Sequence, residues 1–95
     1  MEFDRIEFRL HAIRRMFERR ISMAEVLTAL RAGDVIETYP DDLPYPSVLL
    51  LGSTATGPIH LVVAADSENK RGIIVTVYRP DPLEWEPGFR KRRSP

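Results

Sequence analysis

The sequence predicts an α+β domain in which an N-terminal helical hairpin packs on one face of a four-stranded, mainly antiparallel sheet. In the first third of the chain, apolar residues recur at the spacing of helices and follow two helix-capping patterns. After Gly33, short apolar runs alternate with polar turns, which is typical of strands. Because these turns are short, successive strands are expected to pair antiparallel, with the helices covering the sheet.

The first helix is expected over about residues 5–19. Asp4 and Glu7 have the spacing of a capping box, and the apolar residues that follow recur every three or four positions. The segment IEFRL also alternates as a strand does, so a helix that begins later, nearer His11, is the alternative. The apolar residues expected to form one buried stripe are Ile6, Leu10, Ile13 and Phe17.

A second helix is expected to begin after Ser22, because SMAE is again a capping box that ends in Glu25. It continues through AEVLTALRA, and Gly33 stands where a left-handed residue commonly ends a helix. The helical region therefore covers about residues 5–32.

Four strands are expected between about residues 34 and 79, within the segments VIETY, SVLLLGS, IHLVVAA and IIVTVY. The second segment is a continuous apolar run, which predicts a strand covered on both faces. A loop with three prolines, PDDLPYP, separates the first two strands, and a basic tail occupies residues 88–95. The whole chain, residues 1–95, is expected to form one domain around a single core.

Composition excludes several classes of protein. Hydrophobic residues make up 43% of the chain and charged residues 29%, as in folded rather than disordered proteins. The chain has no cysteine, so disulfides and thiolate zinc sites are excluded, and its two histidines have no metal-ligand spacing. No apolar run approaches the roughly 20 residues that span a bilayer. We therefore expect a cytoplasmic protein with no membrane segment, no metal and no cofactor.

The charge is balanced overall but unevenly distributed. The 14 basic residues equal the 14 acidic residues in number, which argues against a general nucleic-acid coat protein. Twelve of the basic residues are arginines, whose planar guanidinium pairs with phosphate through two hydrogen bonds. An arginine-rich composition also follows from genomic bias, and this alternative stays open.

The stretch LHAIRRMFERRIS places His11 on a helix side that it shares with Arg14, Arg15 and Glu18. Two arginines beside a histidine suit a site in which the arginines hold a phosphodiester and the imidazole moves a proton. The alternative is a solvated helix face on which acids and arginines pair, each pair worth about 0.2–0.5 kcal/mol.

His60 interrupts the otherwise apolar strand segment PIHLVVAA. If the last two strands fold symmetrically about Asn69, His60 lies opposite Tyr78 and Val62 lies opposite Thr76. One face of the sheet would then carry His60, Thr76 and Tyr78, which would line a cleft. The alternative is a histidine at a sheet edge that bonds a backbone carbonyl.

These residue types suit metal-free cleavage of RNA. That reaction needs a base for the ribose 2′-hydroxyl, an acid for the leaving oxygen and cations at the phosphorane. Histidine titrates near neutral pH, and tyrosine donates a hydrogen bond or stacks on a base. The C-terminal segment is expected to fold back so that Trp85 or Phe89 covers the sheet, which leaves Arg90 and Arg93 near the phosphate. A frayed, solvated end is the alternative from Arg92 onward.

Several segments, in this order, resemble the domain of unknown function 4258 family: HAIRRMFERRISMAEVLTALRAGDVIETYP, PYPSVLLLG, GPIHLVVAAD, IIVTVYRPDP and FRKRR. The resemblance covers about residues 8–93. It implies a RelE/MqsR-type toxin domain with two helices against a curved antiparallel sheet (RelE/barnase-like), often encoded beside a zinc-finger antitoxin of the YgiT/MqsA type. Many members have Thr or Ser where this chain has Arg9, so the helix cap differs here. The polar positions that match are His11, Arg15, His60, Thr76, Tyr78 and Arg93.

The leading hypothesis is a toxin of a toxin–antitoxin system that cleaves RNA, free or as ribosome-bound mRNA, without a metal. The acidic stretch around Asp41 and Asp42 is expected to lie away from the RNA. The alternative is a non-catalytic module that binds a partner chain, or an inactive relative of such a toxin. The catalytic residues would be His11, His60 and Tyr78, and the substrate-binding residues Arg14, Arg15, Thr76, Arg90 and Arg93.

Overall fold

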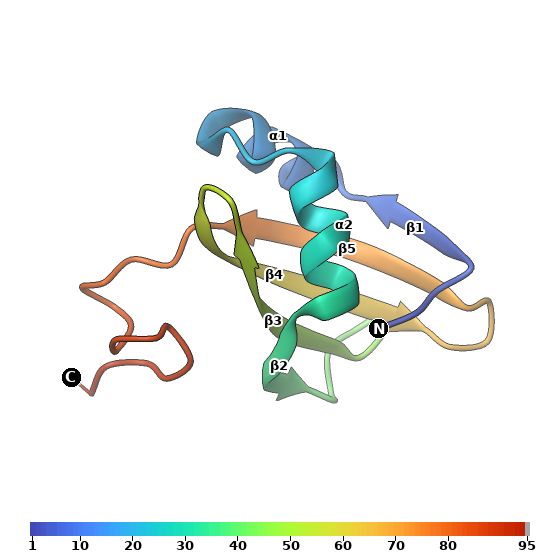
Figure 1. The fold of residues 1–95 in the computed structure, drawn as a ribbon. Helices are drawn as coiled ribbons and strands as arrows, with labels where there is room; N and C mark the ends of the chain where they lie inside the picture. Colours follow the sequence, from blue (N-terminus) through green and yellow to red (C-terminus); the bar gives the residue numbers. More distant parts are fainter. Residues whose placement is uncertain (95) are drawn as a thin grey trace.

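The computed structural model describes residues 1–94 and contains two helices on one face of a five-stranded sheet (Figure 1). The strands lie in the order β1-β5-β4-β3-β2, and β2 to β5 are successive antiparallel neighbours. The α+β class is therefore confirmed, and β2 to β5 form the expected antiparallel meander. The sheet is five-stranded and mixed rather than four-stranded, because β1 joins it parallel to β5. Within residues 1–94, neither helix is long and apolar enough to cross a membrane. In chain order, the elements are β1 Arg5–Phe8, α1 Leu10–Arg19, α2 Met23–Ala32, β2 Asp34–Tyr39, β3 Ser47–Thr54, β4 Gly57–Asp66 and β5 Arg71–Tyr78.

Residues 5–8 form a fifth strand, so the prediction of a helix from residue 5 is wrong and the strand alternative is confirmed. β1 pairs parallel with β5, from Arg5 opposite Arg71 to Phe8 opposite Ile74. Immediately before β1, the Asp4 N–H donates to the carbonyl of Lys70 at 2.8 Å, so the expected capping box with the acid at position 7 does not form. If residues 5–8 were helical, the N–H and C=O groups along this edge of β5 would be left to solvent. Pairing with β1 satisfies them.

α1 does not bury the predicted apolar stripe. Leu10, Ile13 and Phe17 are 62%, 48% and 88% exposed, whereas Ala12 and Met16 are buried. The chain enters α1 directly from a strand, and the Arg9 N–H still donates to the Ile74 carbonyl at 3.0 Å. This attachment determines which side of the helix faces β5, independently of where its largest apolar residues stand.

α2 begins as the sequence predicts and ends differently. Ser22 Oγ accepts from the Glu25 N–H at 3.1 Å, and the Glu25 carboxylate accepts from the Ser22 N–H at 3.2 Å, which is the predicted capping box. Gly33 is extended (φ −74°), so the predicted left-handed end is wrong; Arg20, after α1, takes that conformation instead (φ 55°). Gly33 is needed for space, because a Cβ there would lie 2.4 Å from the Ala29 carbonyl oxygen.

The core lies between the helices and the sheet. On β3, Leu49 and Leu50 are both buried although they point to opposite faces, which confirms the strand predicted to be covered on both sides. At Gly52 the strand touches α2, since a Cβ there would lie 2.3 Å from the Cβ of Ala29. The buried cluster comprises Ala12, Met16, Ile21, Val26, Ala29, Leu30, Leu50, Ile59, Leu61, Val63, Ile74 and Val77.

The register of β4 and β5 confirms the symmetric pairing. His60 lies opposite Tyr78, and Val62 lies opposite Thr76. The register then shifts between Val62 and Val63, because β5 carries one extra residue at this bulge.

We predict that Gly52→Ala destabilises the protein by roughly 1–3 kcal/mol, because the new methyl group overpacks the contact between β3 and α2. Ser53→Ala, at the exposed neighbouring position, should change the free energy of unfolding by no more than about 0.5 kcal/mol. Urea denaturation followed by circular dichroism measures both variants. Equal midpoints for Gly52→Ala and the wild type would contradict the close contact.

Candidate functional site

One face of the sheet is turned away from the helices, and we call it the far face. On β4, Ile59, Leu61 and Val63 pack into the helix-covered core, so His60, Val62 and Ala64 point to the far face. Two segments cover it in part. The loop of residues 40–46 covers one end, and the segment of residues 79–94 covers the end that carries His60.

His11 and Thr76 meet where the sheet edge passes from β1 to α1. His11 Nε2 lies 3.0 Å from Thr76 Oγ1, although the two residues are 65 positions apart. The imidazole is exposed to solvent, and a hydroxyl both donates and accepts, so Thr76 orients the ring in either tautomer. The structure thus brings together one predicted catalytic residue and one predicted substrate-binding residue.

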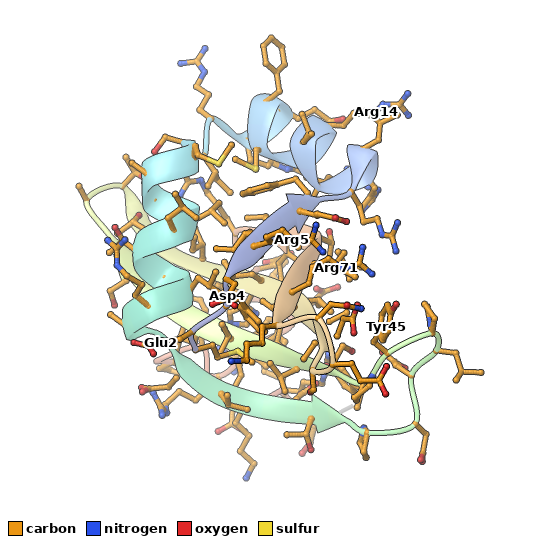
Figure 2. All side chains as sticks on the ribbon, turned by 90° about the vertical axis from the view of Figure 1, so that its right-hand side faces the viewer. Glu2, Asp4, Arg5, Arg14, Tyr45 and Arg71 are labelled. Carbon is orange, nitrogen blue, oxygen red and sulfur yellow. The ribbon has the colours of Figure 1, made fainter. Side chains whose placement is uncertain are left out.

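Two arginines without an acidic partner flank His11 on the chain. Within residues 1–94, neither Arg9 nor Arg14 forms an ion pair. Arg15, by contrast, pairs with Glu18 at 3.2 Å on the exposed helix surface, as the solvated-face alternative expected for this residue. In Figure 2, Arg14 extends on the side of the view away from α2.

A small groove on the far face adjoins this edge. Its volume is about 170 Å³, and it is bounded by the 40–46 loop, β3, β4, β5 and Arg9. Figure 2 shows Tyr45, from this loop, on the same side of the molecule as Arg5, Arg14 and Arg71. The lining residues are Arg9, Asp42, Leu43, Pro44, Tyr45, Ser47, Val62, Ala64, Ile73 and Val75.

Asp42, from the acidic stretch expected to lie away from the RNA, lines this groove together with Arg9. The Ser47 hydroxyl donates to the Asp42 carboxylate at 2.5 Å and orients it. Tyr45 OH accepts from Arg71 at 3.1 Å, which ties the loop to β5. The loop therefore folds back over the sheet, and neither hydrophobic periodicity nor charge distribution indicates this.

His60 is fully buried and lies apart from His11, under the C-terminal segment. Its Nε2 lies 2.8 Å from the Phe89 carbonyl oxygen, and its Nδ1 lies 3.1 Å from Tyr78 OH. Because a carbonyl only accepts, Nε2 carries the proton and Tyr78 donates to Nδ1. The edge of the ring packs on buried Trp85, with 4.5 Å between centroids. Burial lowers the pKa of His60 and so favours the neutral imidazole. Both nitrogens of this ring are engaged by groups of the protein.

The tail arginines lie at the opposite edge of the sheet from His11. Arg90 pairs with Asp34 at 2.9 Å, and Arg92 binds the Glu37 carboxylate through two nitrogens at 2.9 and 3.2 Å. Arg93 donates to the carbonyl of Pro82. The prediction that Trp85 covers the sheet is confirmed, since it packs on His60 of β4. Arg90 and Arg92 are paired with acids of β2, the edge strand opposite β1. The acids of β2, Asp34 and Glu37, stabilise Arg90 and Arg92 in these positions.

The sequence reasoning missed the groove residues Arg9, Asp42, Tyr45 and Ser47. The proline-rich loop PDDLPYP is the signal that could have indicated them, since prolines restrict a loop to few conformations. Within the described part of the chain, residues 1–94, His, Asp and Glu side chains form no group of three that could hold a metal ion.

A family model described as "Domain of unknown function (DUF4258)" matches residues 8–79. No curated protein and no solved structure matches the chain. The matched range contains His11, Thr76 and the whole 40–46 loop and ends at residue 79, where the segment that covers His60 begins. It confirms the family resemblance inferred from the sequence motifs.

We predict that burial of His60 makes the protein less stable as the pH falls below about 6.5. The folded state lowers the pKa of this imidazole below its ordinary 6.5, so the unfolded chain binds the proton more readily. The contribution of neutral His60 to the free energy of unfolding is complete above pH 6.5. It is lost as the pH falls through the pKa that His60 has in the folded protein. Urea denaturation between pH 8 and 5 measures it.

The control variants separate this effect from other titrations. His60→Gln should flatten the slope of unfolding free energy against pH, whereas His11→Gln should retain it. Glu37 acts in a different range, because hydrogen bonds from Arg92 hold its pKa below the ordinary 4.5 and its contribution is lost only at lower pH. The same slope in His60→Gln as in the wild type would contradict the assignment.

Proposed function

We propose that this chain, which belongs to the domain of unknown function 4258 family, is a metal-independent endoribonuclease of the toxin type. The observation that supports this proposal is the pair of His11 and Thr76, exposed at the edge of the far face, beside Arg9 and Arg14, which have no acidic partner among residues 1–94. A titratable imidazole held by a hydroxyl, next to free guanidinium groups, suits proton transfer at a phosphodiester.

In the proposed reaction, His11 removes the proton from a ribose 2′-hydroxyl. The resulting oxygen attacks the adjacent phosphorus, the bond from phosphorus to the 5′-oxygen breaks, and a 2′,3′-cyclic phosphate forms. Solvent returns a proton to the leaving oxygen. Thr76 orients the imidazole through Nε2, which leaves Nδ1 free to face the substrate. Arg9 and Arg14 bind the charge that develops on the phosphorane oxygens.

His60 and Tyr78 have a different role in this proposal. Both nitrogens of His60 are engaged and Tyr78 is its partner, so the two residues hold the C-terminal segment on the sheet. Arg90 likewise fastens that segment to β2, and Arg93 bonds the Pro82 carbonyl within the segment, so in this proposal neither binds RNA. Arg15 lies on the exposed side of α1 and is a weaker phosphate ligand in this proposal, because its ion pair with Glu18 partly neutralises its charge.

The exposed apolar side chains of α1 favour a second candidate function, a module that binds a partner chain. Leu10, Ile13 and Phe17 follow helical spacing and form one stripe, whose exposure in a soluble domain is typical of an interaction surface. A zinc-finger antitoxin encoded beside the chain would be the partner in the toxin reading. In the non-catalytic reading, complex formation would be the whole function.

The endonuclease proposal predicts that His11→Ala lowers the rate constant of RNA cleavage at least 100-fold, as expected for loss of a general base (about 10²–10⁴). Purified protein would be incubated with end-labelled RNA, free and ribosome-bound, in the presence of a chelator. A 2′-deoxy substitution at the cut site should abolish cleavage.

Arg31→Gln, at an exposed position of α2, is the matched control and should leave cleavage unchanged. Thermal unfolding of each variant checks the fold. Cleavage by His11→Ala at the wild-type rate would refute the role of His11. Intact RNA with the wild type, on and off the ribosome, would leave the partner-binding function.

The partner-binding candidate predicts that Phe17→Asp weakens a complex with the protein encoded beside this chain at least about 30-fold, as expected for loss of an interface hot spot. Leu83→Asp places the same charge at an equally exposed leucine outside the stripe and should have little effect. Titration calorimetry with the wild type and both variants measures the difference. Equal affinities for all three would place the interface elsewhere.

A further inference from the structure

The groove on the far face has the size and lining of a pocket for one planar ring. Its volume of about 170 Å³ is below the roughly 300–1,000 Å³ of pockets that enclose drug-sized ligands. Four aliphatic side chains form its floor and Pro44 and Tyr45 form a wall, while polar groups occur at few positions. The aliphatic floor consists of Val62, Ala64, Ile73 and Val75.

We propose that this groove binds one nucleobase of an RNA substrate, and that it prefers guanine. The inference rests on the proposed endoribonuclease function and adds a substrate preference to it. Apolar walls exclude water from the faces of a base, and Tyr45, an aromatic residue, is among the residues that line the groove.

The position of the groove relative to His11 supports this assignment. Arg9, which lines the groove, precedes His11 by two residues. Val75, in the floor, adjoins Thr76, and Val62, also in the floor, is the cross-strand partner of Thr76. A base in the groove would therefore place its own ribose and phosphate near the His11–Thr76 pair, with Arg9 between base and phosphate.

The preference for guanine follows from the polar lining. The Asp42 carboxylate is an acceptor, and the Ser47 hydroxyl that donates to it holds it in one orientation. Guanine offers two adjacent donors, N1–H and the 2-amino group, to the two oxygens of a carboxylate. Adenine and cytosine each offer an amino donor beside a ring acceptor, and the N3–H of uracil lies between two carbonyl acceptors. Only guanine can thus form two parallel hydrogen bonds with Asp42 without repulsion.

The test is titration of the purified protein with the four nucleoside 3′-monophosphates at low salt, by calorimetry. We expect guanosine 3′-monophosphate to bind at least about tenfold more tightly than the other three, as a bidentate contact provides. Asp42→Asn should reduce this preference, whereas Asp41→Asn, outside the groove, should keep it. Arg9→Gln should weaken all four nucleotides by a similar factor, and Arg31→Gln should weaken none.

The possible outcomes separate this inference from the proposed function. No binding, equal binding of all four nucleotides, or an unchanged guanine preference in Asp42→Asn would overturn the pocket. Cleavage of RNA without any guanine dependence would overturn it too, while the endonuclease proposal stands. A guanine preference that depends on Asp42, in a protein that cuts no RNA, would support the pocket and remove the endonuclease proposal.

Discussion

The antiparallel pairing of β4 with β5 is the constraint on which the candidate sites depend. It places His60 opposite Tyr78 and Val62 opposite Thr76, and then shifts by one residue at a bulge. On the Tyr78 side of the bulge, Tyr78 donates a hydrogen bond to His60, and His60 in turn donates to the Phe89 carbonyl of the C-terminal segment. Beside it, Thr76 reaches His11 at the sheet edge, and Val62 and Val75 form the floor of the groove. A register error of one residue would separate all of these groups.

The two histidines show how environment decides the use of one residue type. His60 lies in the interior, its pKa lowered by burial, and both nitrogens bond groups of the protein. His11 is exposed, and within residues 1–94 its ring bonds one group, the Thr76 hydroxyl through Nε2. The sequence alone presents them as equivalent candidates. Their accessibility separates a group that fastens the chain from one that suits proton transfer.

The zero net charge conceals a division of the arginines between two edges of the sheet. At the β2 edge, Arg90 and Arg92 neutralise Asp34 and Glu37, and Arg92 also packs over the Trp85 ring at 4.6 Å. Near α1, Arg9 and Arg14 have no acidic partner within residues 1–94. Cations without partners attract a phosphate more strongly than paired ones, and for this reason the proposed RNA site is assigned to the edge near α1.

Local patterns in the sequence determined the α+β class, the capping box of Ser22 with Glu25, and the pairing of His60 with Tyr78, because each depends on neighbouring residues or on one short turn. Tertiary structure decided that residues 5–8 join β5, since a strand at a sheet edge needs a partner distant in sequence. It also decided which face of α1 is buried, and where the 40–46 loop and the C-terminal arginines lie. These depend on contacts between segments far apart in the chain, which periodicity and composition do not encode.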